Sequence, residues 1–330
     1  MATFKIYKLH FTAPLHIGDK RDDEGVSLKT IQSDTLIAAL TAVLAKVGHH
    51  VPSDGDLGFT VSSLFPYYQQ GEKDATTFFM PMPLQCRLAD LADVGKAKMV
   101  KRIRWVDTAL YSSILAGENL FDGKCDYFGN IHGEYLSAKP VPDRFIQSEM
   151  CQRVKLEDRT GKHDALPYYV DRITFADNAG FYFLAAGDTK LLNKAISILA
   201  QEGIGTDRNV GYGFFDVTTE ELTIDTPADA NHVVSLSLLI PASKKQLDEL
   251  FDSDEIAYEL IRRGGWITSA PHHQLRKNAI YGFLPGSVFG KPASDVCGTI
   301  VDLAPAIVKN SSTAHPVWRD GRAIMLPIKR

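Results

Sequence analysis

The sequence predicts an α+β protein made of two ferredoxin-like units, residues 1–225 and 226–330, with a hairpin region inserted into the first. Three observations predict this class. The first unit begins with a strand and a helix and ends with strand, helix, glycine-rich loop and strand, and the order strand then helix restarts after residue 226. With 330 residues, 45% apolar and 23% charged, the chain can also fill two ordinary cores.

The amino-terminal part predicts a strand, a long loop and a helix. The segment FKIYKLHF (4–11) alternates at period two, which is typical of a strand with one buried face. Leucines and valines in SDTLIAALTAVLAKVG then recur at helical spacing until Gly48. We expect Ser33 to be the N-cap of this helix and Asp34 to favour the positive end of its dipole.

The rest of the first unit supplies its remaining strands. FFMPMPL (78–84) is extended but contains prolines, which predicts a sheet edge or a surface position. FYFLAAG (181–187) predicts a strand, after which Asp188 caps a helix that Gly203 ends. A further strand follows the glycine-rich loop. This order is the split β-α-β plan of a ferredoxin-like domain.

The second unit rests on the order of its elements. HVVSLSLLI (232–240) predicts an apolar strand, and KKQLDELFDSDEIAYELIRR (244–263) predicts one amphipathic helix. No exact sequence repeat links the two units.

The charge is unevenly distributed along the chain. The net charge of −4 argues against a protein that attracts free nucleic acid by its overall field. Residues 216–259 nevertheless carry eleven acidic and two basic residues, 260–330 carry ten basic and three acidic, and 96–104 carry five basic and none acidic. A single charged run usually is a solvated face, but together these runs indicate a subunit that lies between partners.

The sequence predicts neither a metal nor a cofactor. Four cysteines stand far apart without a C-x-x-C pair, which argues against a zinc site and a disulfide framework. The charged loop with Asp19, Asp22, Asp23 and Glu24 could hold magnesium, but a solvated loop is the better interpretation, as it is for 252–255. No segment is long and apolar enough to span a membrane, and we expect a cytoplasmic protein.

The glycine-rich loop GIGTDRNVGYGFF (203–215) is the strongest functional signal. Its four glycines allow close backbone approach, so that N–H groups can point at phosphate oxygens. Arg208 and Asn209 at its tip can bind phosphate, sugar or base, and Tyr212 can stack on an unpaired base. The structural alternative is a helix C-cap followed by a hairpin turn, which explains two of the glycines. The loop follows a helix and precedes a strand, the reverse of a dinucleotide site.

Four stretches together carry a resemblance to a known family. They are PLHIGD (14–19) with QSDTLIAAL (32–40), SSLFPYY (62–68) with FFMPMPL, RVKLEDRTGKHDALPYYVDRITF (153–175), and the glycine-rich loop. In this order and spacing, over about two-thirds of the chain, they resemble the RAMP superfamily of CRISPR effector proteins, most closely the fourth subunit of type III-A Csm complexes.

The resemblance implies a non-catalytic RNA-binding subunit with RRM-like folds in antiviral defence. Such a subunit holds the 5′ tag of the CRISPR RNA, joins the large polymerase-domain subunit to a backbone RAMP subunit, and meets target RNA only indirectly. It would read backbone shape and splayed bases. The RNA contacts that the resemblance implies are His16, Gly18, Ser33, Arg153, Tyr169, Arg172, Gly205, Arg208, Asn209, Gly211, Tyr212 and Gly213.

Three alternatives stay open at this point. A CRISPR-RNA processing endoribonuclease of the same superfamily would use His16 as its acid or base, but the resemblance places the glycine loop of those enzymes near the carboxyl terminus, whereas 117 residues follow Gly213 here. His272 and His273 are adjacent and do not form a facing pair. The equivalent capping subunit of a Cmr complex is the second alternative, and a protein scaffold that never touches RNA is the third.

Overall fold

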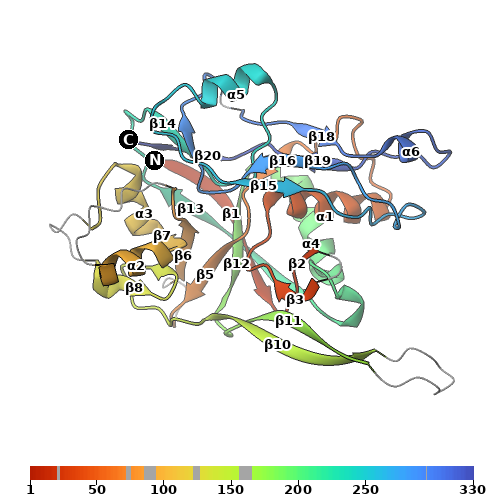
Figure 1. The fold of residues 1–330 in the computed structure, drawn as a ribbon, viewed down its shortest axis with the longest axis horizontal. Coiled ribbons are helices and arrows are strands. Elements are labelled where there is room, and N and C mark those ends of the chain that lie inside the picture. Colours follow the sequence, from red (N-terminus) through yellow and green to blue (C-terminus); the bar gives the residue numbers. More distant parts are fainter. Residues whose placement is uncertain (21–22, 72–75, 85–93, 122–126, 156–165, 295) are drawn as a thin grey trace.

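A nine-stranded sheet forms the centre of the molecule (Figure 1). The computed structural model describes residues 1–330 except 21–22, 72–75, 85–93, 122–126, 156–165 and 295. The mixed α+β class is confirmed. The strands lie in the order β13 (Phe215–Ile224), β1 (Ala2–Phe11), β12 (Ala179–Gly187), β5 (Phe65–Gln69), β6 (Thr76–Pro81), β7 (Trp105–Asp107), β9 (Tyr135–Leu136) and β8 (Ile131–His132), and β4 (Phe59–Val61) also pairs with β12.

Residues 1–225 contain the element order that the sequence predicts. β1, α1 (Ser33–Lys46), β4 with β5, β12, α4 (Thr189–Glu202) and β13 follow one another along the chain. The caps of α4 are confirmed, because the Asp188 carboxylate accepts the Lys190 amide at 2.9 Å and Gly203 ends the helix at φ +77°. The prediction for Ser33 is wrong. Ser33 is the first helical residue, and its hydroxyl accepts the Leu238 amide at 2.9 Å instead of capping α1.

Alternating side chains of β1 give the sheet two apolar faces. Tyr7 and Leu9 point toward α1 and α4, which cover one face. Ile6 points to the other face, where it shares a core with Val234 and Leu326 of the carboxyl-terminal part and with residues of α3 (Thr108–Leu115). The carboxyl-terminal part therefore buries its apolar side chains against the main sheet.

The carboxyl-terminal part has short strands in small sheets. β14 (His232–Ser235) lies between β17 (Val288–Gly290) and β20 (Met325–Ile328), while β15 (Leu260–Arg263) pairs with β16 (Ile280–Phe283) and β18 (Ile300–Asp302) with β19 (Trp318–Asp320). Its helices are α5 (Lys244–Leu250) and α6 (Ala306–Lys309). A second ferredoxin-like unit is not confirmed by this arrangement.

Two element predictions are wrong. The expected helix 244–263 ends at Leu250, because Phe251 packs on the Phe283 ring and draws the chain away from the helical path. The half-exposed Tyr258 packs on the same ring, and the chain continues as β15. The segment 78–84 is not at an edge. Phe79 is fully buried in β6, which pairs with strands on both sides, and the prolines stand at and beyond the end of the strand, where no ladder bond is lost.

A long hairpin projects from the body of the molecule at the lower right of Figure 1. It consists of β10 (Ile146–Lys155) and β11 (Leu166–Phe175), and β3 (Asp23–Ser27) packs beside β11. The remaining elements are β2 (Gly18–Lys20), β3 (Asp23–Ser27), α2 (Val94–Arg102) and the 3₁₀ turns Phe128–Asn130 and Arg208–Val210. In the part of the chain that the structure describes, no helix is long and apolar enough to cross a membrane.

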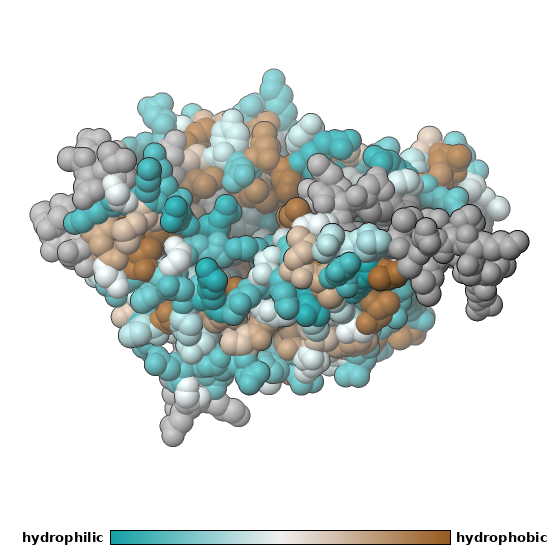
Figure 2. Space-filling model, turned by 60° about the horizontal axis from the view of Figure 1, so that its bottom comes forward, coloured by the Kyte–Doolittle hydropathy of each residue, from teal (hydrophilic) through white to brown (hydrophobic). Residues whose placement is uncertain are grey.

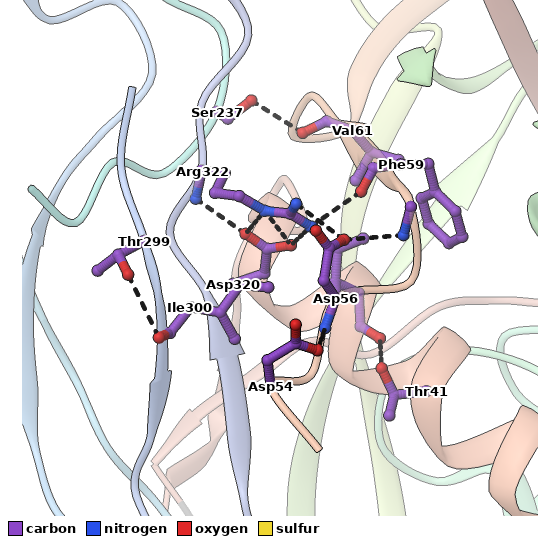
Figure 3. A network of polar contacts seen from close by, with 12 residues as sticks. Thr41, Asp54, Asp56, Phe59, Val61, Ser237, Thr299, Ile300, Asp320 and Arg322 are labelled. Atoms are coloured by element: carbon purple, nitrogen blue, oxygen red, sulfur yellow. Dashed lines mark hydrogen bonds and ion pairs between the residues drawn. The ribbon is translucent and has the colours of Figure 1, made fainter. Parts of the chain in front are cut away.

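Arg322 ties the carboxyl-terminal part to the loop before β4 (Figure 3). Its guanidinium forms ion pairs with Asp320 at 2.7 Å and Asp56 at 2.9 Å and donates to the Phe59 carbonyl at 3.1 Å. These partners raise the pKa of Arg322 although its burial opposes them. The contacts fix the register between segments that are more than 260 residues apart.

Asp34 makes a second, fully buried link between the same parts. It lies in the first turn of α1 and binds Arg263 of β15 at 2.9 Å and Arg319 of β19 at 3.1 Å. Burial alone would raise the pKa of Asp34, but the two arginines outweigh burial, so the pKa lies below its usual value. Asp34 is charged in the folded protein.

Candidate nucleic-acid interface

The two faces of the β10–β11 hairpin have different surroundings. Arg153 lies opposite Tyr168 and Arg172 lies opposite Glu149, and in an antiparallel pair such partners share a face. Tyr169 lies opposite Gln152 on the other face, where it is 57% exposed. Two of the three predicted hairpin contacts, Arg153 and Arg172, are therefore together, and the third is on the opposite side.

Arg153 fastens the hairpin to the glycine-rich loop. Its Nη1 is 2.7 Å from Asp207 Oδ2, and its guanidinium lies 4.8 Å from the centre of the Tyr212 ring. Burial lowers the pKa of Arg153, but the neighbouring Tyr212 hydroxyl and Asp207 carboxylate raise it by more than burial lowers it, so the pKa lies above its usual value. The guanidinium stays charged and holds both partners at once.

Arg172 approaches the same tyrosine from its own strand. The Tyr212 hydroxyl and then Glu149 raise the pKa of Arg172, whose Nε and Nη2 donate to Glu149 at 3.1 and 2.9 Å. Tyr212 itself is only 9% exposed. In this structure it packs against arginine instead of offering a free face to a base.

Three of the four loop glycines are required by packing within the protein. A Cβ on Gly213 would lie 2.0 Å from the Ile204 carbonyl oxygen, one on Gly205 would lie 2.5 Å from the His16 oxygen, and one on Gly203 would lie 2.9 Å from the Tyr212 oxygen. Gly211, at φ +92°, faces open space. Packing within the protein thus explains three of the four glycines, whereas a helix C-cap followed by a hairpin turn was expected to explain two.

The tip of the loop faces solvent. Arg208 and Asn209 are exposed in the 3₁₀ turn between Asp207, at φ +62°, and Gly211. Arg208 lies 3.9 Å from Glu202, a distance that leaves its guanidinium free to donate elsewhere, and Asn209 has no side-chain hydrogen bond to the described residues. These two side chains are available to a ligand.

The loop around His16 forms the third part of this surface. Leu15 pairs with Ile173 of the hairpin and His16 pairs with Thr206 of the glycine-rich loop, so the three predicted segments meet. The His16 ring is buried, with Nδ1 2.6 Å from the Asp171 carbonyl oxygen. Gly18 is exposed, whereas Ser33 is buried and bonded to Leu238.

Known proteins are similar to this chain in sequence over most of its length. Residues 228–328 match the family model described as the CRISPR Csm4 C-terminal domain. The chain is 26% identical over 317 residues to the CRISPR system Cms protein Csm4 of Mycobacterium tuberculosis, covering 93% of both chains, and 26% identical over 314 residues to that of Streptococcus thermophilus, covering 92% and 93%. The resemblance to the fourth subunit of Csm complexes is therefore confirmed.

Solved structures have the same fold as this chain. A chain in the crystal structure of a Csm1-Csm4 cassette in complex with cA4 matches with a TM-score of 0.59 at 18% identity, covering 99% of this chain and 98% of that one. A chain in a Csm3-Csm4 subcomplex of the type III-A interference complex matches with a TM-score of 0.60 at 17% identity over the full length of both. The predicted resemblance to the RAMP superfamily and to its Csm branch is confirmed.

Sequence reasoning missed two acids that organise this site. Asp207 binds Arg153, and its positive φ is a conformation that Asp adopts more readily than most residues. Asp171 is buried and accepts the Ser27 amide at 2.9 Å through one oxygen and the Ser148 hydroxyl through the other. An acid within a run of loop glycines was the available signal for Asp207.

No group of three potential metal ligands lies together among the residues that the structure describes. Asp22 of the candidate magnesium loop, Cys86, Cys125 and the hairpin tip 156–165 lie outside the described residues.

Proposed function

We propose that the chain is a non-catalytic RNA-binding subunit of a type III-A Csm complex, which holds the 5′ tag of the CRISPR RNA in the cytoplasm. The junction between the β10–β11 hairpin and the glycine-rich loop carries this proposal. Arg153 binds Asp207 and Tyr212 and thereby fixes the loop. Arg208 and Asn209 extend from the fixed loop into solvent. Such rigid presentation of donors suits a phosphate backbone.

The character of the surface supports a polar ligand. Figure 2 brings forward the lower side of the molecule, where the hairpin lies, and the described residues there are mostly polar, with apolar side chains in small separate patches. Single-stranded RNA offers phosphates and base edges to such a surface.

We further propose partners for this chain from those of its structural relatives. The relatives are found in a Csm1-Csm4 cassette and in a Csm3-Csm4 subcomplex. This chain would likewise bridge a large subunit of the Csm1 type to a backbone subunit of the Csm3 type. We keep residues 1–225 and 226–330 as its two functional units, since the matched carboxyl-terminal family region spans 228–328.

The surroundings of His16 support a structural role over a catalytic one. A general base must reach the 2′-hydroxyl of its substrate, but the His16 ring is buried and its Nδ1 bonds the Asp171 carbonyl oxygen. The ring holds the hairpin to the loop that precedes β2.

The test removes the two exposed donors from the assembled complex. We expect Arg208→Ala with Asn209→Ala to weaken retention of the CRISPR RNA about tenfold, which is the effect of losing one or two contacts to phosphate or base. Thermal stability should be unchanged, because both side chains are exposed. Lys245→Met, at an exposed helix position far along the chain, is the matched control. Unchanged RNA retention in the double variant would remove the basis of the proposal.

The nuclease alternative has a separate test. The isolated chain is incubated with a CRISPR repeat RNA, alone and as His16→Gln. Cleavage that disappears in the variant would establish a processing endoribonuclease in place of a holder.

A further inference from the structure

The hairpin of β15 and β16 carries positive charge that the glycine-loop site does not use. Arg262 pairs with Tyr281 across the two strands, and Trp266 pairs with Arg276 beyond them. No acidic residue occurs between positions 260 and 294. Within the hairpin the basic residues are Arg262, Arg263, Arg276 and Lys277.

The outer face of this hairpin combines a cation with an exposed ring. Arg262 and Tyr281 lie directly opposite each other, so their side chains leave the same face a few ångströms apart. Tyr281 is 62% exposed and Arg262 is exposed as well. Neither side chain has a hydrogen bond or an ion pair with the residues that the structure describes. Arg276 stacks on Trp266, with its guanidinium 5.0 Å from the ring, and keeps its charge at the surface.

The inner face has more cations than anions. Arg263 and Arg319 share the single carboxylate of Asp34, and Lys277 lies in the field of all three. Burial, followed by repulsion from Arg319, lowers the pKa of Lys277 to about 7. Its ammonium group has no hydrogen-bond or ion-pair partner in the described part of the chain. This buried cluster lies on the face opposite Arg262 and Tyr281, so it is not part of their surface.

We propose that the β15–β16 hairpin is a second contact surface for single-stranded RNA, on which Arg262 binds a phosphodiester group and Tyr281 stacks on an unpaired base. The inference rests on the proposed function, since the RNA is the strand held at the glycine-rich loop. Single-stranded RNA fits because it presents phosphates together with bases that a side chain can stack on, whereas a duplex hides its base faces.

The test measures binding of a fluorescently labelled 20-nucleotide single-stranded RNA to the full-length chain by anisotropy at several salt concentrations. Tyr281→Ala should weaken binding about 5- to 100-fold, the usual effect of losing one stacking platform. Arg262→Met should reduce the slope of log affinity against log salt by about 0.7, the value for one phosphate contact to a single strand. Lys245→Met, which removes a charge from the exposed surface of α5, should change neither quantity.

The outcomes separate this inference from the function on which it rests. If Tyr281→Ala and Arg262→Met bind like the wild type while Arg208→Ala binds more weakly, the hairpin is not an RNA surface and the proposed function stands. If the wild type itself does not bind RNA, alone or in the complex, both are wrong. If the hairpin variants keep RNA affinity but lose a protein partner on co-purification, the surface docks an acidic protein and the RNA inference is overturned. Melting temperatures of all variants show whether each one folds.

Discussion

Among the arginine–aspartate junctions that join distant segments of this chain, those of Arg153 and of Asp34 differ in burial and in charge balance. Arg153 and Asp207 connect the hairpin to the glycine-rich loop with both side chains more than one-fifth exposed. Asp34 connects α1 to β15 and β19 with no exposure, and it serves two arginines and a nearby lysine. The first junction is balanced in charge and partly solvated. The second, which we call the buried latch, pairs two arginines with one buried carboxylate. Removing that carboxylate would leave both positive charges uncompensated inside the protein.

The largest effect should follow from breaking the buried latch. Asp34→Asn leaves Arg263 and Arg319 without a counter-charge and should cost about 3–5 kcal/mol of unfolding free energy, measured by urea denaturation. Asp56→Asn removes the more exposed acid of the Arg322 network and should cost about 1 kcal/mol. Equal losses in the two variants would show that burial does not distinguish these networks.

The buried latch should also make the free energy of unfolding depend on pH in the acidic range. The folded pKa of Asp34 lies below its unfolded value. The contribution of Asp34 is therefore present above pH about 4 and is lost as the pH falls through the folded pKa. The wild type should lose stability in that range, and Asp34→Asn should lose less.

A smaller effect, of opposite sign, should come from relieving the surplus charge. The pKa of Lys277 is about 7 in the folded chain, against 10.5 when unperturbed. Since the unfolded chain binds more protons between these values, wild-type stability rises with pH across that window. The full shift would correspond to about 4–5 kcal/mol, and we halve it because Lys277 is partly exposed. Lys277→Met should therefore stabilise the chain by about 2–3 kcal/mol at pH 6 and by less than about 1 kcal/mol near pH 10, measured by denaturation at both pH values. A gain that did not change with pH would mean that packing by methionine, not charge, is responsible.

The smallest effect is expected at the exposed junction. A double-mutant cycle of Arg153→Met and Asp207→Asn should give a coupling of about 1 kcal/mol, because both groups are partly solvated. Coupling of 3 kcal/mol or more would place this junction in the same class as the latch.

Local sequence signals anticipated the regular elements of the first unit well. The period-two pattern of β1, the cap at Asp188 and the stop at Gly203 are confirmed, because each depends on neighbours within a few residues. The prediction of one helix over 244–263 was wrong, because Phe251 and Tyr258 pack on Phe283, which lies outside the predicted segment.

The candidate site was predicted as segments but not as contacts. The sequence pointed to the His16 loop, the arginine hairpin and the glycine-rich loop, and the structure brings them together through the pairs Leu15–Ile173 and His16–Thr206. It did not foresee that Tyr212 is buried beneath Arg153 or that Ser33 bonds Leu238. Such burial depends on which distant segment covers a residue.

The sequence by itself determined the α+β class, the RAMP resemblance and the segments that compose the glycine-loop site, because periodicity, caps and ordered motifs are written in neighbouring residues. Only the tertiary structure decided which charged side chains are paired inside the protein and which remain available to a ligand. Arg263 and Arg262 are adjacent in the chain, yet one is committed to Asp34 and the other faces solvent. Alternation along a strand separates them, and the position of α1 determines which of the two has a partner.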